Sequence, residues 1–266
     1  MAQEKWLVDD AKVIDIELVR KLKVSLIAGK IDIVGHDEPG ARVEVHSVTG
    51  KELKISIDNG TLEIDHPQLS WDNFIEVFSS FRGTARADVS VMVPRDVALT
   101  LGVVSASALV SGLTTDASIS TVNGDVVVDG LTGTLQLNGV SGEIAISDHT
   151  GKVAARTVSG DITASGDLSV FTAESVSGEV FTDLTGVPDQ VRISTVSGAI
   201  TTRLAPGLPA QYKINTVGGR VQLDDSEIKG VHGQYTGKYG VLDAHWLDYK
   251  ANTVSGNINV LHAVSA

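Results

Sequence analysis

A five-residue phrase, Thr-Val-Ser-Gly-Asp in its most regular form, returns along this chain about every eighteen residues. Its glycines are Gly124, Gly142, Gly160, Gly178, Gly198, Gly219 and Gly256. The first three steps are 18 residues each, and a degenerate copy over 234–238 divides the last, longer step. A fixed period of this size is typical of folds in which repeats stack on one another. It constrains the fold more than the function, because one repeat scaffold serves many functions.

Equivalent positions of the copies carry equivalent side chains. Val or Ile stands two residues after most of the glycines, and Val stands two residues before most of them. If each copy adds one coil, these side chains lie about 4.8 Å apart and form apolar ladders inside the fold. The period is less than half of the roughly 40 residues that a propeller blade needs. The pattern therefore predicts an all-β chain with a parallel β-solenoid of ~18-residue coils over residues 104–266.

Residues 1–103 are predicted to form a β-sheet lead-in or cap that continues into the repeats without a linker. Short alternating segments indicate strands, and Asp58-Asn-Gly60 between two of them indicates a tight hairpin. Alternation stops over 66–86, where four aromatic residues recur at helical spacing. These are Trp71, Phe74, Phe78 and Phe81. They either plug the open end of the sheet or form a patch for a partner.

The amino-acid composition limits the kinds of partner that this chain can bind. The 266 residues carry a net charge of -12, and no basic stripe is evident that could neutralise phosphates. We therefore expect neither nucleic-acid binding nor docking on anionic lipid. The chain has no cysteine, and no apolar run is long enough to span a bilayer, so membrane insertion is not expected. Because the first residues lack the pattern of a secretory signal, the default expectation is a cytoplasmic location.

Two polar columns accompany the repeats. The residue after the glycine is acidic in four successive copies, at Asp125, Glu143, Asp161 and Glu179. Such an acidic stripe could bind divalent cations or a basic partner, or the residues could be solvated turn positions. The serines before the glycines have no regularly placed histidine. We expect them to be turn hydroxyls that bond to the backbone.

Catalytic patterns are weak. The seven histidines do not have metal-ligand spacing, and neither a His-Glu-x-x-His nor a Gly-x-Ser-x-Gly phrase occurs. Asp224 and Asp225 form an adjacent carboxylate pair beside a repeat, and the only sizeable interruptions of the repeats are 204–209 and about 226–232. The sequence therefore predicts no catalytic residues, no cofactor and no enzyme activity. A β-helix enzyme that processes glycans is the alternative.

The repeated phrase, preceded by Val91-Met-Val-Pro94 and Leu99-Thr-Leu101, resembles the bacterial β-strand-repeat family of putative adhesins, a domain of unknown function. The resemblance covers about residues 13–262. It implies a β-solenoid without established catalytic residues, and the adhesin name implies surface display.

The first functional expectation is a non-catalytic scaffold or interaction protein whose partner is an unknown protein or glycan. The second is a self-assembling structural element. The last regular copy, 252–260, is followed by only a few residues, which predicts an uncapped edge. Because an exposed edge can pair with another chain, homo-oligomers could form by edge stacking.

Overall fold

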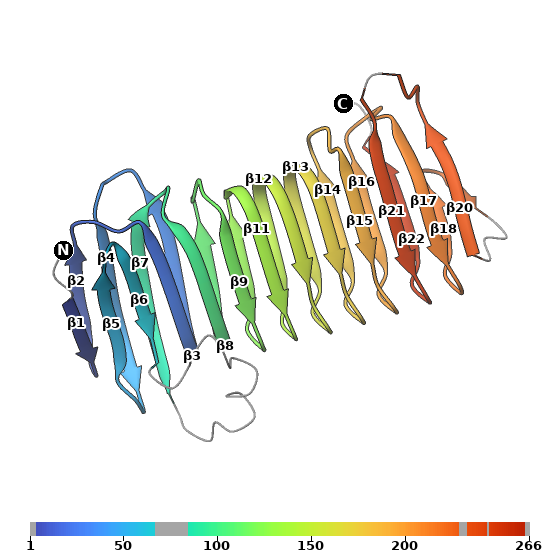
Figure 1. Ribbon diagram of the computed structural model, residues 1–266. Coiled ribbons are helices and arrows are strands. Elements are labelled where there is room, and N and C mark those ends of the chain that lie inside the picture. The colour runs from blue at the N-terminus through green and yellow to red at the C-terminus, as the bar shows by residue number, and fades with distance from the viewer. Residues whose placement is uncertain (1–3, 67–84, 229–232, 244, 264–266) are drawn as a thin grey trace. The chain divides into compact units, whose positions relative to one another are not determined.

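The computed structural model describes residues 4–66, 85–228, 233–243 and 245–263, and all regular structure within these residues is β-strand (Figure 1). The all-β prediction is confirmed. Contacts divide the chain into two compact units, residues 1–133 and 134–266. The sequence-based division at residue 103 stays a prediction. In the described part, no helix is long and apolar enough to cross a membrane.

The first unit contains two sheets that share their long central strands. One sheet joins β1 (Glu4–Val8), β5 (Leu53–Asp58), β6 (Thr61–Asp65), β3 (Lys21–His36), β8 (Ala98–Ser111) and β9 (Ala117–Thr121) in that order. The other joins β2 (Lys12–Ile16), β4 (Ala41–Thr49), β7 (Arg86–Pro94), β3, β8 and β10 (Val126–Asp129). The strands β3 and β8 therefore belong to both sheets.

Alternation explains why these segments are strands with one buried face. In β7, for example, Ala87, Val89 and Val91 are buried while the intervening residues are more exposed. The predicted hairpin is confirmed: Asn59 and Gly60 both have positive φ, and β5 pairs antiparallel with β6. The predicted strands over 23–27 and 30–34 are joined in the single strand β3, which bends at Gly29. There, a Cβ would lie 1.9 Å from the carbonyl oxygen of Ala87.

The second unit also contains two sheets, whose strands are mostly parallel. Its elements are β12 (Ile144–Arg156), β13 (Ile162–Glu174), β14 (Val180–Leu184), β15 (Gln190–Ser194), β16 (Ile200–Leu204), β17 (Ala210–Thr216), β18 (Val221–Leu223), β19 (Ser226–Ile228), β20 (Gly233–Tyr239), β21 (Leu247–Thr253) and β22 (Ile258–His262). The strand β11 (Thr132–Gly139) spans the division between the units. Ile144 pairs with Ile162, and Ile162 pairs with Val180, which are steps of one eighteen-residue period. Parallel stacking of successive repeats is thus present here.

The order of the last repeats in space differs from their order in sequence. Strand β16 pairs with β22, which in turn pairs with β18, and β15 pairs with β21, which in turn pairs with β17. The repeat made of β21 and β22 therefore lies between two repeats that precede it in the chain (Figure 1). The predicted uncapped edge at 252–260 is wrong, because both strands of that repeat have neighbours on both sides.

The degenerate copy is also not a stacked repeat. Strand β20, which contains 234–238, pairs antiparallel with β17, and β19 pairs antiparallel with β18. The chain thus doubles back after β18, then returns to insert its last repeat. Antiparallel strands are compatible with this short return, whereas a further parallel repeat would need a full crossover.

The repeated phrase forms a tight corner in which glycine is required for space. A Cβ on Gly160, Gly178 or Gly198 would lie 1.8–1.9 Å from the carbonyl oxygen of the motif glycine in the neighbouring repeat. None of these three has positive φ. Glycine is therefore required at these corners by the close approach of the neighbouring backbone and not by a positive φ.

The residue three before the glycine turns inward and bonds to it. Thr157, Ser175 and Thr195 are 6–7% exposed, and each hydroxyl oxygen accepts a hydrogen bond from the backbone N–H of its motif glycine at 2.9–3.1 Å. The bond satisfies a buried donor that has turned away from the strand ladder. Within the corner, the Thr side chain thus points inward, the Val and Ser side chains point outward, and the Gly faces inward again.

This geometry corrects the predicted valine ladder. In the first unit, Val104 and Val122 are buried with Ile27 and Ala85, as expected. In the second unit, the equivalent valines are 46–68% exposed. They are Val140, Val158, Val176, Val196, Val217 and Val254. Val122 follows the same kind of corner, because Thr121 accepts the N–H of Gly124 at 3.0 Å, but there the valine packs against Ile27 and Ala85. The corner therefore turns the valine away from the interior of its repeat, and burial depends on whether another segment covers it.

Candidate functional site

The six exposed valines form one column, here called the valine stripe. The carbonyl oxygens of five of these valines, all except Val217, accept a backbone hydrogen bond from the next repeat in the stack, which fixes the order of the column. That order is Val140, Val158, Val176, Val196, Val254 and Val217. The serines beside it behave as predicted: Ser159, Ser177 and Ser197 donate their hydroxyls to valine carbonyl oxygens of the neighbouring repeat at 3.3–3.4 Å. The stripe is therefore an apolar line bordered by hydroxyls.

The acidic stripe lies on the other side of the same corner. Asp125 is exposed in the first unit, and Glu143, Asp161 and Glu179 are exposed on successive repeats of the second. The Asp161 carboxylate accepts a hydrogen bond from the backbone N–H of Glu179 at 2.8 Å, and Asn257 does the same for Arg220 at 3.1 Å. This position thus helps to join neighbouring repeats. In the described residues, no three carboxylate or imidazole groups are placed to hold a metal ion.

The predicted aromatic patch of Trp71, Phe74, Phe78 and Phe81 lies outside the described residues. His66, just before it, is fully buried, and its Nδ1 accepts a hydrogen bond from the backbone N–H of Ile27 at 3.3 Å. Burial lowers the pKa of His66 to about 4, so the imidazole is neutral at pH 7.

The Asp224-Asp225 pair does meet the 204–209 loop, as the enzyme alternative requires. Both carboxylates line a pocket of about 770 Å³ in the second unit, together with Arg203, Pro206 and Gly207. Asp224 has a positive φ of 50°, which is uncommon for a residue other than glycine. Arg203 is already paired with Asp183 at 2.9 Å.

His262 also lines this pocket, and both of its ring nitrogens have hydrogen-bond partners. Its Nδ1 lies 3.0 and 3.1 Å from the two carboxylate oxygens of Asp224, and its backbone N–H donates to Asp224 at 2.7 Å. Because a carboxylate accepts, Nδ1 carries the proton, and Nε2 can accept from the Tyr212 hydroxyl at 3.3 Å. Burial, with a smaller effect from Asp224, raises the pKa of Tyr212 and keeps that hydroxyl protonated.

The ring of Tyr239 stacks on His262, with ring centroids 3.8 Å apart and an interplanar angle of 17°. A histidine that acts as a general base needs a nitrogen facing its substrate. Here one nitrogen faces Asp224 and the other faces Tyr212. These contacts join the end of β22 to β17 and β20, and they give the Asp224 carboxylate a structural partner.

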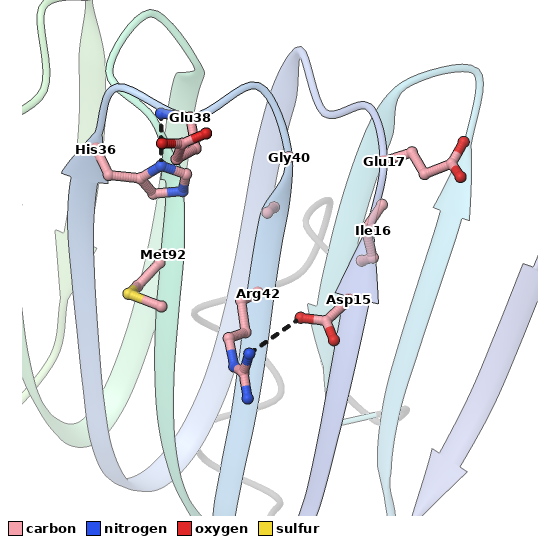
Figure 2. A pocket seen from close by; sticks show the side chains of 9 residues that line it. Asp15, Ile16, Glu17, His36, Glu38, Gly40, Arg42 and Met92 are labelled. Atoms are coloured by element: carbon pink, nitrogen blue, oxygen red, sulfur yellow. Dashed lines mark hydrogen bonds and ion pairs between the residues drawn. The ribbon is translucent and has the colours of Figure 1, made fainter.

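A second pocket, of about 690 Å³, lies in the first unit and was not indicated by the sequence (Figure 2). Arg42 of β4 points toward Asp15 on the neighbouring strand β2, with Nη1 and Oδ1 3.6 Å apart, and its Nε donates to Glu44 at 2.8 Å (Figure 2). His36 lies at the turn above, where its Nδ1 accepts the backbone N–H of Glu38 at 3.0 Å. Among its lining residues, the carboxylates of Asp15, Glu17 and Glu38 outnumber the single cation of Arg42.

Comparisons with known proteins agree with the repeat pattern. The family model described as Toastrack DUF4097 matches residues 19–261, so the chain belongs to the Toastrack DUF4097 family. The predicted resemblance to the adhesin-like repeat family is thereby confirmed. No curated protein matches the chain.

Several solved structures resemble the chain over nearly its whole length. One is a putative cell adhesion protein from Clostridium sporogenes, with 14% identity, a TM-score of 0.33, and coverage of 98% of this chain and 100% of that one. A putative lipid binding protein from Parabacteroides distasonis has 10% identity and a TM-score of 0.48 over 96% and 97% of the two chains. A putative adhesin from Bacteroides fragilis has 10% identity and a TM-score of 0.36 over 95% and 97%. Similarity at this level does not transfer a function.

The sequence missed the valine stripe, although it contained one relevant signal. A hydroxyl residue stands three before nearly every motif glycine, and a hydroxyl oxygen can accept the glycine N–H only if it turns inward. That requirement turns the following valine away from the interior of its repeat, although Val122, after Thr121, is turned in the same way and is buried against Ile27 and Ala85.

Proposed function

We propose that this chain is a β-solenoid that acts as a non-catalytic scaffold and presents columns of equivalent side chains to a partner protein. The parallel pairing of equivalent residues from β12 through β14 supports the solenoid. Each such repeat contributes one strand segment to each of two sheets, as in β13, which pairs with β14 through its first half and with β15 through its second half. A coil that returns to the same corner every period has this form.

The valine stripe is the observation that carries the proposal. Six valines that are about half exposed or more lie in one line, and the neighbouring strand spacing places them about 4.8 Å apart. Covering the exposed half of one valine is worth roughly 1 kcal/mol before the costs of association. An apolar line with serine hydroxyls on one side matches an interface with an apolar centre and a polar rim.

The other two functions are less well supported. The hypothesis of self-assembly depended on an uncapped last repeat. That repeat lies between two others, and the far edge of β17 pairs with the antiparallel strand β20. Glycan processing rested on Asp224 and Asp225, but Asp224 is bound to His262 through both oxygens. We therefore propose that the protein is not an enzyme.

Site-specific photo-cross-linking in the source cell tests the proposal. A photoreactive amino acid is introduced at Val158, Val176 or Val196, one at a time. The matched control is Val187, which is 57% exposed but lies outside the stripe. We expect the three stripe positions to give the same adduct and Val187 not to give it.

Specificity is then tested with a Val158→Asp, Val196→Asp double variant that carries the cross-linker at position 176. The adduct should disappear, because two charges now flank the cross-linker in the apolar line. An adduct that forms equally at Val187, or that survives the double variant, would overturn the proposed role of the stripe.

A further inference from the structure

Three cationic side chains stack in one column on the outer face of the second unit. Arg192 of β15 pairs in register with Lys250 of β21, and Lys250 pairs with Lys213 of β17. All three point outward, because the residues on either side of each one in its strand are buried. Parallel strands place their Cα atoms about 4.8 Å apart. This cation column was invisible in the sequence, since its members come from strands that are not consecutive.

Two of the three cations in this column have no carboxylate partner in the described part of the protein. Lys250 contacts Asp248 at 2.5 Å, whereas in the described part neither Arg192 nor Lys213 lies within ion-pairing distance of a carboxylate. Like charges in register repel by about 1 kcal/mol per pair in water. The chain carries 33 acidic against 21 basic residues, but Asp248 is the one acidic side chain among the nine outward positions of these three strands. An external anion would relieve the repulsion.

Hydrogen-bonding groups border the column on both sides, and apart from Asp248 they are neutral. On one side, Asn215 donates to the Asn252 side chain at 2.6 Å, and Asn252 donates to the Ser194 hydroxyl at 3.2 Å. On the other side, Gln190 and Gln211 flank Asp248 in register. All nine outward positions of these three strands are polar. Side-chain amides both donate and accept, so they match hydroxyl groups.

We propose that this face binds an acidic polysaccharide that carries one carboxylate per sugar, such as a polyuronate. The carboxylates would lie along the cation column and the sugar hydroxyls along the amide columns. Nucleic acid fits less well, because the three strands present no aromatic side chain for base stacking on this face. An anionic membrane fits less well, because apolar side chains that could enter the interface are missing from the nine positions.

The proposal is independent of the protein partner proposed for the valine stripe, because the two surfaces share no side chain. Either can fail while the other holds. The valine stripe depends on the exposed corner, whereas the cation column depends on the insertion of β21 between β15 and β17.

Binding of the full chain to polygalacturonate is measured by affinity electrophoresis, with dextran, polyphosphate and single-stranded DNA as comparison polymers. The test variant is Arg192→Gln, Lys213→Gln, Lys250→Gln. The control is Lys12→Gln, Lys21→Gln, Lys152→Gln, which removes the same charge from exposed positions elsewhere. We expect the test variant to bind about tenfold more weakly and the control to change less than about twofold.

Because the three side chains point outward, thermal melting should show that the variant folds. A single Arg192→Glu exchange provides a second variant that leaves the Lys250–Asp248 contact intact, and it should also weaken binding. Equal losses in test and control variants, or binding of polyphosphate or DNA as tight as that of polygalacturonate, would overturn the proposal. Equal binding of dextran would show that the charges do not matter and would overturn it too.

Discussion

Gly219 stacks directly on Gly256, and a Cβ added to Gly219 would lie 1.8 Å from the carbonyl oxygen of Gly256. No real Cβ can lie that close to an oxygen, so one of the two backbones would have to move. The adjacent Gly218 is different, since its nearest neighbour would be the carbonyl oxygen of Val254 at 3.8 Å. The two glycines of one corner therefore have different reasons to be glycine.

We predict that Gly219→Ala lowers the free energy of unfolding by about 3 kcal/mol, because the backbone of the neighbouring repeat has to move. Gly218→Ala should be neutral or stabilise by up to about 1 kcal/mol, because alanine restricts the unfolded chain. Urea unfolding of both variants measures the difference. Equal effects at the two positions would contradict the stacking of Gly219 on Gly256.

The corner hydroxyl should be needed for its oxygen rather than its size. Thr195→Val keeps the shape but leaves the N–H of Gly198 without its acceptor at 2.9 Å, which should cost about 1–2 kcal/mol. Thr195→Ser should cost much less, since Ser175 makes the same bond in its own repeat. Thermal unfolding compares the two. If the serine variant were as unstable as the valine variant, the hydrogen bond would not be the reason for the residue.

Exposed and buried valines should respond differently to a hydroxyl. Val176→Thr lies in the valine stripe and should change the free energy of unfolding by less than about 0.5 kcal/mol. Val191→Thr places a hydroxyl in a fully buried position and should cost about 2 kcal/mol. Denaturant unfolding gives both values. A large cost at Val176 would mean that the stripe is part of the core.

His66 should make stability depend on pH. Its pKa is about 4 in the folded protein and about 6.5 when unfolded, so the unfolded state binds more protons between these values. Stability is complete above pH 6.5 and falls by up to about 3 kcal/mol as the pH drops toward 4.

The matched variant His66→Asn keeps a side-chain acceptor for the N–H of Ile27 but cannot titrate. Urea unfolding at several pH values between 7.5 and 4 should show a steeper loss for the native chain than for this variant. Parallel curves would contradict the assignment of a buried neutral imidazole.

Local features of this fold could be predicted from the sequence. Alternation located the strands of the first unit, and Asn59-Gly60 located a hairpin, because these signals act within a few residues. The eighteen-residue period gave the register of Ile144 on Ile162.

Two features could not be predicted, for different physical reasons. The period shows where each corner lies. At the corner, however, the valine and the following serine both point outward, so the alternation of inward and outward residues is interrupted there. For this reason Val176 was predicted to be buried although it is exposed. The order of the repeats in the stack depends on the strand with which the segment after β18 pairs. Because β20 pairs antiparallel with β17, the last repeat could insert beside β15, and Arg192 came to lie beside Lys250. No local signal contains that order.

The inserted position of the last repeat is the central claim, because the order of the valine stripe and the cation column both depend on it. The chain has no cysteine, so introduced pairs report neighbouring strands without interference. Neighbouring parallel strands meet the Cα separation of about 4.4–6.8 Å that a disulfide needs, and strands two apart do not.

Disulfide formation is therefore compared in two double variants. In Arg192→Cys with Lys250→Cys, the cysteines lie on neighbouring strands, and a disulfide should form under mild oxidation. In Arg192→Cys with Lys213→Cys, β21 separates the cysteines, and none should form. The opposite outcome, a disulfide only in the second variant, would mean that the repeats stack in sequence order and would contradict the account.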